Sequence, residues 1–203
     1  MKPIVIATGN AHKLDEYRLL LPGIELASLA QFPPMAPVDE TEPDFVGNSI
    51  LKAQAVFEHT GLPALADDSG LEVNALNQRP GVLSARYAEG TDRDRYLKLL
   101  AEMENESNRK ARFTCAIAVA GLPQMAVRPP LTHQRNCLIS IGHSYGQITH
   151  APIGDNGFGY DPIFRIEDGR TMAQLTAAEK HSISHRGHAA RQIIDVLRSL
   201  IGV

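Results

Sequence analysis

The sequence feature that most constrains this chain is an apolar run that ends in two adjacent aspartates. Residues 62–66 are apolar and typical of a strand, and Asp67, Asp68, Ser69 and Gly70 follow them directly. Acids, a hydroxyl and a glycine in this order indicate a turn. We therefore expect the two carboxylates at the end of a strand, facing a cleft.

Carboxylates in such a position suit a metal-assisted active site. Mg²⁺ prefers oxygen ligands and is usually held by one or two carboxylates together with the phosphates of a substrate. Gly70 allows the backbone to approach a ligand closely. An ordinary solvated turn has the same composition, so this stretch alone leaves both interpretations open.

Length and composition indicate a folded chain without a membrane or nucleic-acid surface. A chain of 203 residues with 43% apolar content buries a sizeable core as one domain or as two associated lobes. The formal net charge of -3 is not typical of a protein that binds nucleic acid or anionic membranes. Without a membrane-spanning run or a secretion signal, a cytoplasmic location is expected. Cys115 and Cys137 are therefore expected as buried thiols.

A phosphate site is predicted near the N-terminus. Residues 4–7 form a short β-rich run, residues 8–10 a turn, and apolar residues then recur at helical spacing. The start of that helix and Lys13 in its first turn attract an anion. The segment lacks the spacing of a Walker P-loop. A helix cap at Asn10 with a solvated Lys13 is the alternative.

A second helix is predicted to end near His59. Thr41 and Asp44 have capping-box spacing, and Pro43 favours the first helical turn. Asn48 and Lys52 lie four residues apart and share one helix face.

Glu40 precedes this helix. It joins Asp68 around a metal only if the tertiary fold brings the two together.

The middle of the chain carries predicted core elements. We expect a returning strand at residues 71–73, a helix at 92–103, and a half-buried strand at 113–119. Residues 121–134 form an extended connection, followed by a strand at 137–141.

Residues 153–162 are the second informative stretch. Three glycines give backbone freedom, and Phe158 and Tyr160 offer flat faces on which a nucleobase can stack. A glycine-rich turn with aromatic side chains in the core is the competing interpretation.

The C-terminal part combines a short helix, a polar stretch and a final amphipathic helix. Thr176 and Glu179 form a capping box for the short helix, which contains Lys180. In the polar stretch before the final helix, Arg186 can read a carbonyl oxygen or pair with phosphate, and His185 can exchange a proton near neutral pH. The histidine spacing there also suggests a transition-metal site, but no neighbouring carboxylate completes the usual ligand set.

Four stretches together resemble the inosine triphosphate pyrophosphatase family of house-cleaning enzymes for dITP, ITP and XTP. They are residues 8–13, 66–71, 158–162 and 184–187, and they follow one another in the family's order. The resemblance implies an α/β fold with an elongated mixed β-sheet flanked by helices. It also implies two lobes around a central substrate cleft within a single domain spanning residues 1–203, and usually a homodimer.

The resemblance implies Mg²⁺-dependent attack of water on the α-phosphorus of a purine nucleoside triphosphate, which releases a nucleoside monophosphate and pyrophosphate. Asp68 is the implied general base and, with Glu40, a metal ligand. The implied substrate-binding residues are Thr8, Gly9, Asn10, Ala11, His12, Lys13, Asn48, Lys52, Ser69, Phe158, Gly159, Tyr160, Asp161, Lys180, His185 and Arg186.

Within that set, residues 8–13 and Lys180 are implied to hold phosphate and Phe158 to stack on the base. His185 and Arg186 are implied to read the 6-oxo group of the purine. The chain departs from the family pattern at residues 121–136, which are longer, and at residues 143–146, where many relatives carry an acid before the glycine.

Three alternatives stay open from the sequence. Within enzymes, the substrate can be a different nucleotide. A nucleotide sensor without turnover has no need of a carboxylate near the α-phosphate, and a binder of damaged bases in nucleic acid is disfavoured by the acidic charge balance. The adjacent Asp67 can also share the titration of Asp68.

Overall fold

The computed structural model describes residues 3–8 and 11–201, and the predictions for Gly9 and Asn10 lie outside them. The main helices are α1 (Ala11–Leu20), α2 (Phe45–Thr60), α3 (Asp92–Glu102), α4 (Ala177–Ile183) and α5 (His185–Ile201). The strands are β1 (Ile4–Ile6), β2 (Leu26–Ser28), β3 (Ala64–Val73), β4 (Lys110–Ala120), β5 (Thr132–Gln134), β6 (Cys137–Ile148) and β7 (Phe164–Arg165).

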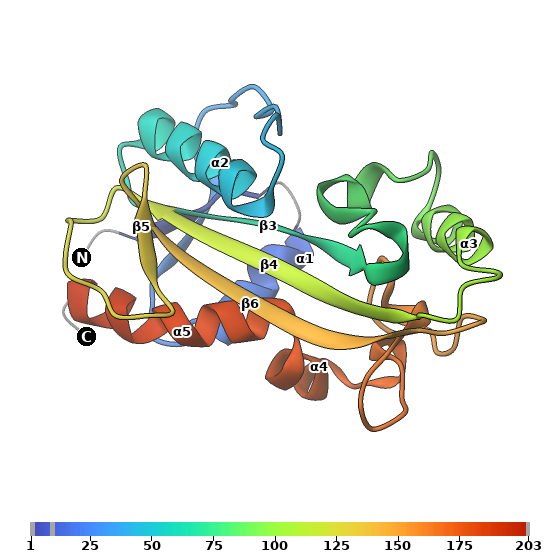
Figure 1. Cartoon of the computed structure of the whole chain (residues 1–203). Coiled ribbons are helices and arrows are strands. Elements are labelled where there is room, and N and C mark those ends of the chain that lie inside the picture. The colour runs from blue at the N-terminus through green and yellow to red at the C-terminus, as the bar shows by residue number, and fades with distance from the viewer. Residues whose placement is uncertain (1–2, 9–10, 202–203) are drawn as a thin grey trace. The chain divides into compact units, whose positions relative to one another are not determined.

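The strands form one mixed sheet of seven strands in the order β2-β1-β3-β4-β6-β5, with β7 paired to β6. Strand β1 runs parallel to β2 and β3, whereas β5 and β7 run antiparallel to β6. The expected α/β fold with a mixed sheet flanked by helices is confirmed (Figure 1).

The chain divides into two compact units. Unit 1 comprises Met1–Asp68, Cys115–Gly142 and Arg186–Val203, and unit 2 comprises Ser69–Thr114 and His143–His185. Each unit has its own apolar core, so each is described by itself.

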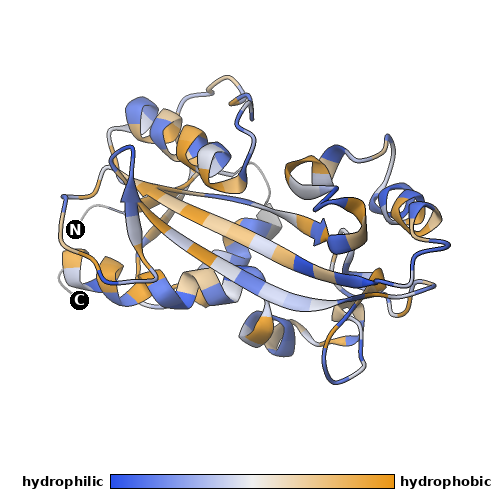
Figure 2. Cartoon of the chain, in the orientation of Figure 1, coloured by the Kyte–Doolittle hydropathy of each residue, from blue (hydrophilic) through white to orange (hydrophobic). Residues whose placement is uncertain are grey.

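In unit 1 helices cover both faces of the sheet (Figure 1). Because successive side chains of a strand point to opposite faces, alternate residues of β3 and β4 meet different helices. One face packs against α1 and α5 through Ile4, Ile6, Tyr17, Leu21, Leu65, Cys115, Ile117, Ala189 and Ile193. The other packs against α2 through Ile50, Ala53, Ala66, Ala118 and Ala120. The parts of β4 and β6 in unit 1 are accordingly mostly apolar along their length (Figure 2).

This packing corrects the prediction of a half-buried strand at residues 113–119. Cys115, Ile117 and Val119 lie on the face that α1 and α5 cover, and the alanines between them are buried as well. The small alanines allow α2 to approach closely. The strand is therefore buried on both faces.

Unit 2 is built around a second core that includes residues of β3, β4 and α3. Leu71 and Val73 of β3 belong to the same buried cluster as Phe113, Leu99 and Phe164. Among residues 3–8 and 11–201, no helix is long and apolar enough to cross a membrane.

Two element boundaries differ from the sequence prediction. The acidic stretch is not a turn, because β3 continues from Ala64 to Val73 through both aspartates. The final helix begins at His185, so His185 and Arg186 lie in its first turn and not in a preceding loop.

The helix caps are partly as predicted. The capping box of Thr176 and Glu179 is confirmed. Helix α2, however, is capped by Asp44, whose side chain accepts from Gly47 N, so Thr41 is not the cap and Pro43 precedes the helix.

The burial of both cysteines leads to a testable expectation. Cys115 and Cys137 are free thiols in the core, and burial raises the pKa of Cys137 to about 11. We expect neither thiol to react with DTNB at pH 8 in the native protein, because little thiolate forms and the reagent has no access. In urea both thiols should titrate. Rapid reaction of either thiol in native buffer would contradict this packing.

Candidate active site

Strand β3 carries Asp67 and Asp68 just beyond its pairing with β1. The parallel register ends with Ile6 opposite Leu65, and Ala7 N donates to Leu65 O at 2.8 Å. Ligands of open α/β sheets bind outside the carboxyl ends of parallel strands. The two acids therefore lie at the place in unit 1 where such a sheet can hold a ligand.

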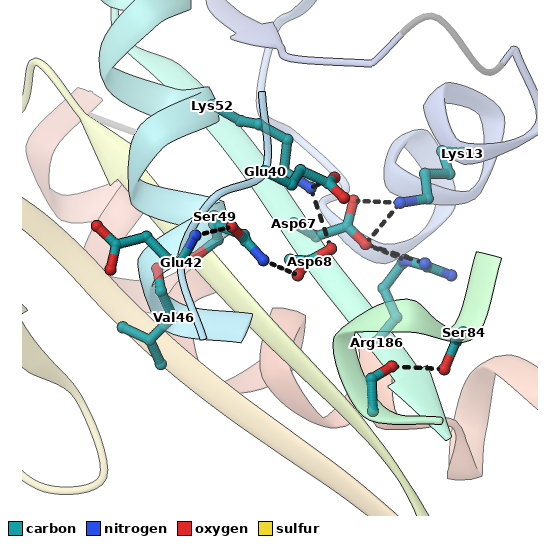
Figure 3. A network of polar contacts seen from close by, with 12 residues as sticks. Lys13, Glu40, Glu42, Val46, Ser49, Lys52, Asp67, Asp68, Ser84 and Arg186 are labelled. Carbon is teal, nitrogen blue, oxygen red and sulfur yellow. Dashed lines mark hydrogen bonds and ion pairs between the residues drawn. The ribbon is translucent and has the colours of Figure 1, made fainter. Parts of the chain in front are cut away.

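The two acids point to opposite faces of the strand. Leu65 lies on the face covered by α1 and α5, and Ala66 lies on the face covered by α2. Since side chains alternate along a strand, Asp67 points to the same face as Leu65, and Asp68 points to the same face as Ala66. Each carboxylate consequently meets a different set of cations (Figure 3).

Asp67 is the centre of a buried ion-pair network. Lys13 Nζ donates to both of its oxygens at 3.0 and 3.1 Å. Arg186 Nε and Nη2 donate to Asp67 Oδ2 at 3.3 and 3.0 Å, and Arg186 Nη1 donates to Glu16 Oε2 at 2.6 Å. Burial alone raises the pKa of Asp67, but Lys13 and Arg186 outweigh it and hold the pKa well below its usual range.

Asp68 has a second set of partners on the other face. Asn48 Nδ2 donates to Asp68 Oδ2 at 3.3 Å, and Lys52 Nζ donates to Asp68 Oδ1 at 3.2 Å. The same ammonium donates to Glu40 Oε1 at 2.9 Å. Burial raises the pKa of Asp68, and Lys52 acts in the opposite direction. The predicted set of Glu40, Asn48, Lys52 and Asp68 is thus brought together.

The start of α2 explains how Glu40 reaches this set. Glu42 N donates to Asn48 Oδ1 at 3.0 Å, which orients the Asn48 amide. A Cβ on Gly47 would lie 2.5 Å from Glu42 Cβ, so only glycine allows the preceding segment to lie against the helix. This contact places residues 40–42 beside the first turns of α2.

Unit 2 holds the predicted aromatic stretch in a fixed loop. Phe158 is 49% exposed, and Lys180 Nζ lies 4.4 Å from the centroid of its ring. Lys180 also pairs with Asp161, which accepts from Phe158 N at 2.9 Å. Gly157 has φ +79°, and a Cβ there would lie 2.1 Å from Asp161 Oδ2. The loop therefore presents an exposed aromatic face beside an ammonium.

Two further contacts anchor the same loop. Gly159 N donates to Asp92 Oδ2 at 2.7 Å, and Tyr160 hydroxyl donates to Ser84 O at 2.8 Å. Tyr160 is buried, so it supports the loop from the core of unit 2.

The adjacent residues His185 and Arg186 have different surroundings. The ring of His185 stacks on Phe113 with centroids 4.9 Å apart and an interplanar angle of 15°. Arg186 is only 2% exposed, and all three of its guanidinium nitrogens donate to Asp67 or Glu16. These contacts use three of its five N–H donors, and the expectation that Arg186 reads a purine edge stays a prediction.

Five of the remaining predicted residues have described positions. Lys180 lies over the ring of Phe158, and its implied contact with phosphate stays a prediction. Thr8 follows β1, and its N donates to Ile6 O at 2.8 Å. Ser69 is part of β3. Ala11 and His12 begin α1.

The sequence analysis missed Glu16 and Asp92. Glu16 lies three residues after Lys13 in α1, and this spacing places both on one face. That signal was available in the sequence. Asp92 contacts Gly159, which lies 67 positions away in the chain, and no local sequence pattern predicts such a contact.

The donor set on the Asp68 face suits a hard divalent cation. Among the described residues no group of three or more His, Cys, Asp or Glu forms a metal site, whereas Glu40 and Asp68 share one cationic group, the Lys52 ammonium. Mg²⁺ typically takes one or two carboxylates and completes its shell with substrate phosphates and water. Glu40 and Asp68 fit that pattern.

The buried network around Asp67 yields a stability prediction. Arg186→Met leaves Asp67 and Glu16 without their shared guanidinium, so we expect a loss of about 3–5 kcal/mol in the free energy of unfolding. Urea denaturation measures this loss. The matched control is Arg18→Met, which breaks a pair with Asp15 whose side chains are 56% and 68% exposed and should cost less than about 1 kcal/mol. Equal losses in the two variants would refute the role of the buried network.

Comparison with known proteins gives consistent full-length matches. A model of the Ham1 family matches residues 4–196. The chain is 42% identical over 211 residues to the dITP/XTP pyrophosphatase of Streptomyces coelicolor, with all of both chains covered. It is 43% identical over 209 residues to that of Geobacillus kaustophilus, covering 100% of this chain and 97% of the relative. The solved Ham1 protein of Staphylococcus aureus matches with a TM-score of 0.84 at 37% identity, covering 98% of this chain and 99% of that one.

Proposed function

This chain belongs to the Ham1 family and is a nucleoside-triphosphate pyrophosphatase, and we propose that it hydrolyses dITP, ITP and XTP with Mg²⁺ as cofactor. The products are the nucleoside monophosphate and pyrophosphate. The relatives support hydrolysis of non-canonical purine nucleoside triphosphates.

The observation that carries the proposal is the pair of carboxylates that shares one cationic group on the α2 face of β3. Glu40 and Asp68 both contact Lys52 Nζ, at 2.9 and 3.2 Å. Carboxylates alone repel a triphosphate, so a site of this kind needs cations to bind one. A protein that only bound nucleotides would gain nothing from Asp68.

Asp68 is assigned as the general base. It takes a proton from a water molecule while the water oxygen forms a bond to the α-phosphorus and the bond from that phosphorus to the pyrophosphate oxygen breaks. Asn48 Nδ2 donates to Asp68 Oδ2 at 3.3 Å, and this hydrogen bond orients the carboxylate. Glu40 and Asp68 would hold Mg²⁺, which when bound would neutralise part of the phosphate charge.

Lysines of unit 1 are assigned to the triphosphate. Lys13 lies in the first turns of α1, where the helix dipole also favours an anion. Lys52 carries the second ammonium. Asp67 is assigned to holding Lys13 in place, because it lies on the face opposite Asp68 and is fully engaged by Lys13 and Arg186.

Residues of unit 2 are assigned to the base. Phe158 supplies the stacking surface, with Lys180 beside its ring at 4.4 Å. His185 is assigned to reading the 6-oxo group that separates hypoxanthine and xanthine from adenine. The homodimer, the cytoplasmic location and the absence of nucleic-acid binding stay predictions from the sequence.

The activity is tested by hydrolysis of ITP, XTP, ATP and GTP with Mg²⁺, with and without EDTA. We expect metal-dependent release of pyrophosphate from ITP and XTP, and Asp68→Asn should lower kcat by at least about 100-fold because general base catalysis contributes that much. Tight binding without turnover would instead identify a sensor. Release of single phosphate would show that water attacks a phosphorus other than the α-phosphorus.

The aromatic surface is tested separately. Phe158→Ala should lower kcat/KM for ITP by about 5- to 150-fold, since stacking of a base contributes about 1–3 kcal/mol. Tyr145→Ala removes another exposed aromatic of unit 2, 68% exposed, and should leave kcat/KM within about twofold. If both variants behave alike, Phe158 is not the stacking residue.

A further inference from the structure

Lys52 occupies the point where the two proposed metal ligands converge. Its ammonium donates to Glu40 Oε1 at 2.9 Å and to Asp68 Oδ1 at 3.2 Å. The side chains of Lys52, Glu40 and Asp68 are only 16%, 26% and 11% exposed. A cation that bridges two carboxylates with little exposure stands where a divalent cation would bind.

The charges around this point explain why the ammonium stays there. Burial disfavours the charged form of Lys52, but Asp68, Asp67 and Glu40 outweigh burial and raise its pKa. Glu42, from the same segment as Glu40, pairs with Arg135 at 2.6 Å.

The nearby cations Lys13 and Arg186 contact Asp67 on the opposite face of β3. Of the cations with described contacts here, Lys52 is thus the one that bridges Glu40 and Asp68.

We propose that Lys52 is an internal cation that closes the metal site of the free protein and is displaced when the metal and the nucleotide bind together. The proposal rests on the assignment of Glu40 and Asp68 as metal ligands. Two cations at one carboxylate pair repel each other strongly in a partly buried site. The ammonium must therefore leave when the metal enters.

The triphosphate gives Lys52 a new partner. Lysine is a compact charge on a flexible four-carbon stem, so its ammonium can move from carboxylate to phosphate oxygens without a change in α2. Metal and nucleotide then favour each other's binding. The metal displaces the Lys52 ammonium from the carboxylates, and the triphosphate gives the displaced ammonium a new partner. The free protein consequently binds the metal weakly.

The test measures binding of Mn²⁺, as a spectroscopic substitute for Mg²⁺, by electron paramagnetic resonance in the absence of nucleotide. Lys52→Gln and Lys52→Met should bind Mn²⁺ about tenfold or more tightly than the unmodified protein, because the competing charge is gone. The matched control is Arg18→Gln, which removes an exposed cation of α1 that pairs with Asp15 and should change the affinity by less than about threefold.

The coupling provides a second measurement. The α,β-methylene analogue of ITP should tighten Mn²⁺ binding in the unmodified protein, and it should do so clearly less in Lys52→Gln. Circular dichroism verifies that the variants are folded. Affinity for Mn²⁺ that is unchanged or weaker in both folded Lys52 variants would overturn the proposal.

A further variant separates this proposal from the assignment of the site. Adding Glu40→Gln to Lys52→Gln should abolish the gain in Mn²⁺ affinity, because a ligand is lost. If Lys52→Gln gains affinity and the gain survives Glu40→Gln, the metal lies elsewhere and the assignment of Glu40 fails. If hydrolysis of ITP is normal but Lys52→Gln gains no affinity, the proposed function stands and the role of Lys52 is refuted.

Discussion

The structure of unit 1 depends on burying two adjacent carboxylates in one strand. An unpaired buried charge is prohibitively unfavourable, so β3 can pass through Asp67 and Asp68 only if cations meet it on both faces. Lys13 and Arg186 meet Asp67, and Lys52 meets Asp68. The helices that cover the sheet are therefore held by charge as well as by apolar contact.

The two faces have different chemical properties. On the Asp67 face the guanidinium of Arg186 is 2% exposed and has carboxylates on both sides, which gives a fixed arrangement in which α1, α5 and β3 are joined. On the Asp68 face a single flexible lysine bridges the buried Asp68 and the partly exposed Glu40. In the proposed mechanism, the network on the Asp67 face supports the strand and the Asp68 face carries the chemistry.

Unit 2 keeps the aromatic ring of Phe158 exposed at its surface. Asp161 accepts from Phe158 N and pairs with Lys180, while buried Tyr160 anchors the loop from below. These polar contacts hold the loop although it contains three glycines.

The sequence by itself determined the helices with clear caps and the apolar segments of the sheet, and it predicted the stretches to which the chemistry is assigned. Thr176 with Glu179 and the periodic residues of α1 and α5 are local signals, and local hydrogen bonding and periodicity decide such elements. Tertiary structure alone decided that β3 continues through its acids, that Asp67 and Asp68 have separate partners, and that Arg186 is buried. The partners of Asp67 lie 54 and 119 positions away. The acidic stretch has the composition of a turn, but it forms a buried strand because ion pairs with these distant cations offset the cost of burying the carboxylates.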